Sequence, residues 1–76
     1  MNEEVVAIIA EVLGVTSDQI HPELSIGDIP AWSSMAQMRL ISTLEQRLEL
    51  EFPIEGLFDL TNVQALIDEV NKVKNA

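Results

Sequence analysis

The amino-acid sequence predicts an all-α fold: a small four-helix bundle with three main helices and a short third helix. Apolar residues recur at helical spacing in three segments, and no segment alternates apolar and polar residues as a half-buried strand would. The chain has 76 residues, of which 47% are hydrophobic, which suffices for one core but not for a deep catalytic cleft. We therefore expect a single domain over residues 1–76.

The first helix is predicted over residues 3–13. Asn2 has a side chain suited to an N-cap, Glu3 and Glu4 suit the positive end of a helix, and Gly14 is a natural stop. Apolar residues at helical spacing form the expected buried stripe: Val5, Val6, Ile8, Ile9, Val12 and Leu13.

A long connection runs from Val15 to Ser33, and a loop of this length in a compact domain is often functional. His21 lies in this loop, where we expect it to be solvated. Four apolar residues are spaced through the loop and predict that it is pinned onto the core: Ile20, Leu24, Ile26 and Ile29.

The second main helix is predicted over residues 34–49, where two acids and two bases cancel. Its predicted buried face consists of Met35, Met38, Ile41, Leu44 and Leu48, with Leu40 beside it. For Met35 and Met38 a second interpretation stays open, because methionines also form adaptable contacts at binding surfaces.

In the C-terminal third of the chain, the sequence pattern predicts a short helix followed by a long one. The segment Ile54–Leu60 is expected to contribute Leu57 and Phe58 to the core. Thr61 followed three residues later by Gln64 is a capping-box signature that predicts the start of the last helix. The residues expected to point inward from this helix are Val63, Leu66, Ile67, Val70 and Val73.

Composition excludes several classes of function. Thirteen acids against four bases give a formal net charge of −9, which argues against a nucleic-acid partner because phosphate binding needs a basic surface. The chain has no cysteine, and its acids and single histidine do not converge at the spacing of a metal site, so we expect no metal. No signal peptide or membrane span is recognisable, so a cytoplasmic protein is expected.

Intrinsic catalysis is not expected either. A serine hydrolase would pair Ser34 with His21 and an acid on a scaffold with an oxyanion hole. The G-x-S-x-G elbow is absent, and the three glycines are too isolated to form a phosphate-binding loop. We therefore predict no catalytic residue.

Ser34 lies where the long loop meets the second main helix, and two roles are open for it. Its hydroxyl could be a point of attachment, because a helix N-terminus favours a phosphate. Alternatively, Ser33 or Ser34 simply caps the helix, with Ser34 and Gln37 forming a capping box. Position alone favours the cap.

Four segments together give the sequence a family resemblance: Ser33-Ser34-Met35, Leu40 through Leu48, Phe52-Pro53-Ile54, and Leu60 through Leu66. The first is similar to the Asp-Ser-Leu motif that opens helix two in the acyl carrier protein family, the phosphopantetheine-binding carrier domains. The others are similar to the leucine-rich helix two and the C-terminal half of that family. The resemblance covers nearly the whole chain, and it implies an acyl-carrier-like bundle.

The resemblance implies that Ser34 carries a 4′-phosphopantetheine arm derived from coenzyme A, with acyl groups held as thioesters. Ser33 then is the helix cap and the fallback attachment site. The implied partners are a phosphopantetheinyl transferase and acyl-loading and acyl-processing enzymes. A freestanding, monomeric carrier in a specialised fatty-acyl or polyketide-type pathway is the leading interpretation. An aminoacyl or peptidyl carrier, or an unmodified adaptor with the carrier fold, are the alternatives.

Two departures from the family pattern bear on these partners. Ser33 replaces the motif aspartate, and Arg39 and Arg47 make helix two neutral where fatty-acid-synthesis carriers are acidic. We therefore expect a different set of partners, which contact Trp32, Met35, Met38 and Arg39.

Overall fold

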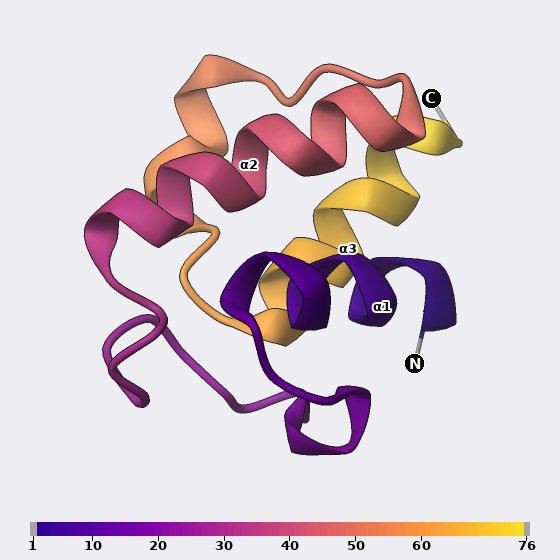
Figure 1. Cartoon of the computed structure of the whole chain (residues 1–76). Coiled ribbons are helices and arrows are strands. Elements are labelled where there is room, and N and C mark those ends of the chain that lie inside the picture. The colour runs from indigo at the N-terminus through magenta and orange to yellow at the C-terminus, as the bar shows by residue number, and fades with distance from the viewer. Residues whose placement is uncertain (1, 76) are drawn as a thin grey trace.

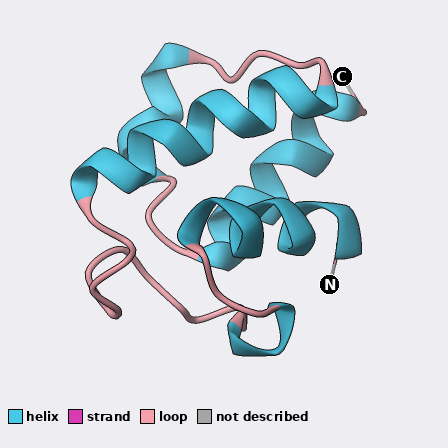
Figure 2. Cartoon of the chain, viewed as in Figure 1, coloured by secondary structure: helices cyan, strands magenta, loops and turns pink. Residues whose placement is uncertain are grey.

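The computed structural model describes residues 2–75, and within them the chain is helical (Figure 1). Its elements are α1 (Glu3–Leu13), η1 (Ser17–Gln19), α2 (Ser34–Leu48), η2 (Ile54–Asp59) and α3 (Val63–Lys74), where η denotes a 3₁₀ helix. These residues form no strand, only an isolated antiparallel bridge between Ser25 and Asn62 (Figure 2). The all-α, four-helix prediction is confirmed, with η2 as the short third helix, and η1 is an additional turn.

Local signals set both ends of α1 as predicted. The Asn2 side chain caps the helix by accepting a hydrogen bond from the Val5 N–H at 3.2 Å. At the other end Gly14 takes the left-handed conformation, with φ of 69°, and stops the helix. The predicted stripe is buried except for Val12, which is only partly buried.

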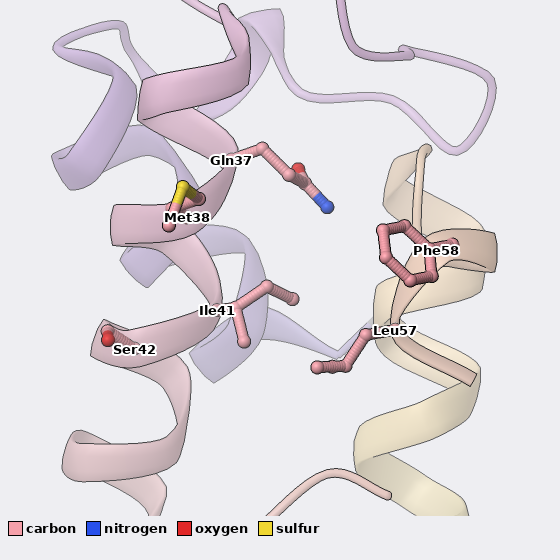
Figure 3. A pocket seen from close by; sticks show the side chains of 6 residues that line it. All are labelled: Gln37, Met38, Ile41, Ser42, Leu57 and Phe58. Carbon is pink, nitrogen blue, oxygen red and sulfur yellow. The ribbon is translucent and has the colours of Figure 1, made fainter. Parts of the chain in front are cut away.

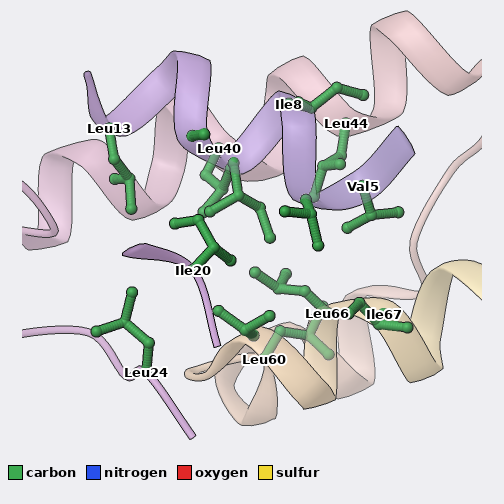
Figure 4. Close-up of a cluster of buried hydrophobic side chains, with 14 of the residues drawn as sticks. Val5, Ile8, Leu13, Ile20, Leu24, Leu40, Leu44, Leu60, Leu66 and Ile67 are labelled. Carbon is green, nitrogen blue, oxygen red and sulfur yellow. The ribbon is translucent and has the colours of Figure 1, made fainter. Parts of the chain in front are cut away.

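The core lies between the three α-helices, and α1 packs against both α2 and α3 (Figure 4). The long loop closes one end of it. Ile20 and Leu24 are buried, and Ile26 and Ile29 pack partly against the core, so the prediction of a pinned loop is confirmed. Trp32, the last loop residue before the cap of α2, is also fully buried.

The buried face of α2 differs from the prediction. Ala36, Leu40 and Leu44 are its buried residues, whereas Met35 is 77% and Met38 73% exposed. The helix carries apolar residues on two neighbouring stripes, and α1 covers the stripe with four-residue spacing that begins at the small Ala36. Ile41 and Leu48 lie at its edge and are partly buried.

The expectation that Leu57 and Phe58 both enter the core is half wrong. Leu57 is partly buried and Leu60 is buried, but Phe58 is 91% exposed. In a 3₁₀ helix successive residues lie about 120° apart, because three residues complete a turn. Leu57 and Leu60 therefore share the inner face, and Phe58 points away from it.

The predicted Thr61–Gln64 capping box does not form. Asn62 is the N-cap of α3, and its Oδ1 accepts a hydrogen bond from the Ala65 N–H at 2.8 Å. The preceding residue is bonded to the long loop, because the Thr61 carbonyl accepts a hydrogen bond from the Ile26 N–H at 2.9 Å. The helix consequently begins one residue later than the sequence motif indicates.

Candidate functional site

The N-terminus of α2 is capped by Ser33. Its Oγ accepts a hydrogen bond from the Ala36 N–H at 3.2 Å, and its carbonyl accepts from the Gln37 N–H at 2.9 Å. Its backbone is extended, with φ of −88° and ψ of 176°, as an N-cap requires. Ser33 is therefore the cap, and the alternative capping box between Ser34 and Gln37 is absent.

Ser34 is the first residue inside α2, and its side chain is exposed. Among the hydrogen bonds of residues 2–75, none involves its Oγ, and none occupies the N–H groups of Ser34 and Met35. These N–H groups belong to the first turn, which has no intrahelical partners and carries the positive end of the helix dipole. A hydroxyl that is free to react, beside free donors and a positive potential, suits a covalently attached phosphodiester.

The loop before Ser33 is held by its own hydrogen bonds. The Gly27 N–H donates to the Trp32 carbonyl at 2.8 Å, and the Trp32 N–H donates to the Ile29 carbonyl at 3.1 Å. Gly27 has φ of 88°, a value that side chains with a Cβ rarely adopt. This compact turn fixes where the chain enters α2, and so it fixes the position of Ser34.

A side-chain relay ties the loop to η2. The Trp32 Nε1–H donates to Gln37 Oε1 at 2.7 Å, and Gln37 Nε2 donates to the Leu60 carbonyl. The orientation of the amide is forced, because an indole N–H only donates and a carbonyl only accepts. Gln37 thus joins three segments that are distant in sequence: the loop, the first turn of α2 and the end of η2.

Trp32 was expected among the partner-contacting residues, and this expectation is wrong for the structure described. Its side chain has 0% exposure because it fills the core beneath the start of α2, with its one polar atom satisfied by Gln37. The three other predicted contact residues, Met35, Met38 and Arg39, are exposed.

An apolar groove of about 420 Å³ lies between α2 and η2. Ile41 extends from α2 toward Leu57 and Phe58 on η2, as Figure 3 shows, and Gln37 closes one end. The residues that line the groove are Gln37, Met38, Ile41, Ser42, Leu57 and Phe58. Gln37 and Met38 lie about one turn from Ser34 along the helix, so a flexible group attached to Ser34 starts near the mouth of this groove.

The charged residues of α2 are arranged unevenly. Arg47 forms an ion pair with Glu11 of α1, with 2.7 Å between Nη1 and Oε2. Arg39 is exposed, and no ion pair within 4 Å is formed by it among residues 2–75. Between Ser34 and Leu44 the helix has no acidic residue, so its first half carries a single positive charge.

The sequence did not identify Gln37 and Leu57 as site residues. Gln37 lies between two exposed methionines in the sequence and offers no periodic signal, and the sequence predicts Leu57 only as a core residue.

His21 is expected to be solvated, and its side chain is 57% exposed, with Nδ1 3.4 Å from Glu23 Oε2. In residues 2–75 no group of three His, Asp or Glu side chains is placed to hold a metal ion, and no helix is long and apolar enough to cross a bilayer.

Comparison with known proteins connects this geometry to a family. A sequence model described as "Phosphopantetheine attachment site" matches residues 3–70, which include Ser34 and both walls of the groove. The chain is also similar to the solution NMR structure of a holo acyl carrier protein from Geobacter metallireducens. The TM-score is 0.84 at 33% sequence identity, over 96% of this chain and 84% of that one.

The match spans most of the chain and includes both the sequence pattern and the arrangement of the helices. The prosthetic group of this chain is a covalently attached phosphopantetheine. The chain therefore belongs to the acyl carrier protein family of phosphopantetheine-binding carrier domains.

Proposed function

We propose that this chain is a freestanding carrier protein whose 4′-phosphopantetheine arm is attached to Ser34 Oγ. The arm's terminal thiol holds acyl cargo as thioesters, and partner enzymes carry out the chemistry on that cargo. One observation carries the proposal: Ser34 combines an exposed, unbonded hydroxyl with the unoccupied N–H groups at the start of α2. Tethering raises the local concentration of the cargo at each partner's active site.

The choice of Ser34 over Ser33 rests on their hydrogen bonds. Ser33 Oγ already accepts from the Ala36 N–H, and converting it to a phosphodiester would remove the cap of α2. Ser34 Oγ has no structural bond to lose. Attachment at Ser34 therefore leaves the helix start intact, and the phosphate gains the donors that the first turn leaves free.

The attachment reaction needs a phosphopantetheinyl transferase and coenzyme A. Ser34 Oγ attacks the phosphorus that bears the pantetheine, the hydroxyl proton is released, and the bond to the adenosine 3′,5′-bisphosphate leaving group breaks. The product is a phosphodiester on Ser34. The chain contributes an accessible nucleophile and a helix N-terminus that favours the phosphate charge.

The groove between α2 and η2 supports acyl rather than aminoacyl cargo. Its lining is apolar apart from Gln37 and Ser42. An alkyl chain buried there gains about 0.8 kcal/mol per CH₂ removed from water, whereas a charged aminoacyl group gains nothing comparable. We accordingly infer a fatty-acyl or polyketide-type pathway. The charge of α2 favours a specialised one: this helix holds Arg39, Arg47 and only one acid, Glu45, whereas an acidic helix two typifies carriers of primary fatty-acid synthesis.

We also propose that residues 1–76 form a single carrier domain that works as a monomer in the cytoplasm. The net charge of −9 supports the monomer, because like charge opposes self-association. Sedimentation equilibrium at several concentrations would show one species of 8.4 kDa. A mass that rises with concentration would contradict it.

Intact-mass spectrometry tests the attachment. After incubation with coenzyme A and a broad-specificity transferase, the wild type and Ser33→Ala should each gain the mass of one phosphopantetheine, and Ser34→Ala should gain none. A gain that survives Ser34→Ala would move the site to Ser33. No gain in any variant would favour an unmodified adaptor with the carrier fold.

A further inference from the structure

Four large hydrophobic side chains are exposed among residues 2–75, and two of them line the groove between α2 and η2. The four are Met35 at 77%, Met38 at 73%, Ile54 at 78% and Phe58 at 91%. Met38 and Phe58 line the groove, whereas Met35 and Ile54 do not. An exposed apolar side chain gains free energy when an apolar group covers it. The two lining residues therefore gain from contact with an apolar occupant of the groove.

Met38 and Phe58 lie at the end of the groove that is nearer to Ser34. Met38 is four residues beyond Ser34, which is about one turn along the helix. In Figure 3 the Phe58 ring lies near the level of Met38, and Ile41 and Leu57 lie farther along the groove. A chain that enters from Ser34 therefore passes this exposed pair before it reaches the inner part of the groove.

The inner part of the groove is anchored to the core, and its entrance is not. Ile41 and Leu57 are partly buried and pack against the core. Phe58 is turned away from the core because Leu57 and Leu60 occupy the inner face of η2. The Phe58 ring can consequently change rotamer without any loss of core packing.

On the basis of the function proposed above, we propose that Met38 and Phe58 close over the acyl chain of the cargo, one from each wall of the groove. We call these two residues the clasp. The occupant is an alkyl chain because the arm on Ser34 delivers it to this end of the groove, and because the lining residues carry no charge. Contact with the clasp makes retention of the cargo depend on the length of its alkyl chain.

The length of the groove sets the class of cargo. Its lining on α2 extends from Gln37 to Ser42, five residues apart, which corresponds to a rise of about 7.5 Å. Carbon–carbon bonds of about 1.5 Å advance an extended alkyl chain by roughly 1.3 Å per carbon, so about six carbons span this length. The clasp therefore fits a medium-chain acyl group, whereas an acetyl group is too short to pass it.

The test compares the thermal stability of loaded forms of the full-length protein. A broad-specificity transferase loads the apo protein from acetyl-, hexanoyl- or octanoyl-coenzyme A, and intact mass confirms each product. The hexanoyl form should have a Tm about 5 °C above that of the acetyl form, because the chain is buried only in the folded state. The octanoyl form should melt within about 2 °C of the hexanoyl form, since carbons beyond the groove stay in water.

Two matched pairs of variants examine the clasp. Phe58→Ala should reduce the difference in Tm between the hexanoyl and acetyl forms to about half or less, because one of the two covering side chains is lost. Ile54→Ala also truncates an exposed side chain of η2, but outside the groove, and should leave this difference within about 1 °C of the wild-type value. On α2, Met38→Gln should reduce the difference, and Met35→Gln should not.

Nuclear Overhauser effects locate the chain independently of stability. In a hexanoyl form whose acyl group is labelled with carbon-13, we expect contacts from the chain to the Phe58 ring and to the Met38 methyl group. We expect none to the Met35 methyl group, which lies outside the groove. Contacts to Met35 in place of Phe58 would refute the clasp.

The possible failures are distinguishable. If every form is loaded but Tm does not depend on chain length, or if Phe58→Ala and Ile54→Ala act equally, the clasp is refuted and attachment of the arm stands. If Phe58→Ala slows loading and leaves the difference in Tm unchanged, Phe58 contacts the transferase and the clasp is again refuted. If no acyl-coenzyme A adds mass to the wild type, the carrier function fails, and the clasp fails with it.

Discussion

Replacing Gln37 by leucine should destabilise the protein far more than the half-exposed position of this residue suggests. The substitution removes the amide that joins Trp32 to Leu60 and leaves two polar groups without partners. The Trp32 indole N–H is fully buried, and Leu60, whose carbonyl accepts the second bond, is 5% exposed. Leucine is close to glutamine in size, so loss of packing contributes little.

The magnitude follows from these two groups. An unsatisfied buried donor or acceptor costs about 1–3 kcal/mol, so the pair costs about 2–6 kcal/mol. Gln37 lines an open groove, and water that enters this groove can bond to the two polar groups and offset part of the cost. We therefore expect the free energy of unfolding to fall by about 2–3 kcal/mol. For a domain of this size that loss lowers Tm by about 10–20 °C.

Urea denaturation followed by far-UV circular dichroism measures the free energy of unfolding. Gln46→Leu, an exposed glutamine on the same helix, is the control and should change it by less than about 0.5 kcal/mol. A double-mutant cycle with Trp32→Phe isolates the indole bond and should give a coupling of about 1–2 kcal/mol. Equal effects of Gln37→Leu and Gln46→Leu, or additivity in the cycle, would refute the reasoning.

Three further stability predictions follow, all measured by urea denaturation. Asn62→Ala removes the observed cap of α3 and should cost about 1 kcal/mol, whereas Thr61→Ala should cost less than about 0.5 kcal/mol; the reverse order would restore the capping box at Thr61. Leu44→Ala opens a cavity in the core and should cost about 2–5 kcal/mol, while Phe58→Ala should cost less than about 0.5 kcal/mol because its ring is exposed; comparable losses would mean that the ring packs inside. Gly14→Ala should cost about 1 kcal/mol, because φ of 69° is strained for alanine even though no atom lies within 4 Å of the added Cβ; an unchanged stability would contradict the left-handed cap.

The parts of the fold that depend on neighbouring residues could be predicted from the sequence. The bounds of α1 follow from an asparagine cap, an apolar stripe and a glycine stop, all within one stretch of chain. The assignment of Ser33 as the cap and Ser34 as the free hydroxyl also follows locally, once the family register places the start of α2 between them.

The structure differs from the sequence-based prediction where segments distant in sequence pack together. Helical periodicity locates an apolar stripe on α2, but only packing against α1 selects the face with Leu40 and Leu44 over the face with the methionines. The start of α3 moved because the long loop pairs with Thr61 across the bridge between Ser25 and Asn62. A capping motif describes a single helix and contains no information about such pairing.

The site itself was predicted in part. Ser34, for which the resemblance implies attachment, and Arg39, an expected partner contact, are exposed, but Trp32 lies in the core. A tryptophan just before a helix gives no periodic signal of burial. Its partner Gln37 was considered only for a capping box, because the hydrogen bonds to Trp32 and Leu60 span 5 and 23 residues of sequence.

The most direct test of the central claim is to locate the arm by fragment-ion mass spectrometry. The holo protein is digested, and the peptide that contains both Ser33 and Ser34 is fragmented between them. We predict that the phosphopantetheine remains on fragments that contain Ser34 and is absent from N-terminal fragments that end at Ser33. Its presence on fragments that end at Ser33 would contradict the account, because the arm would then occupy the hydroxyl that caps α2.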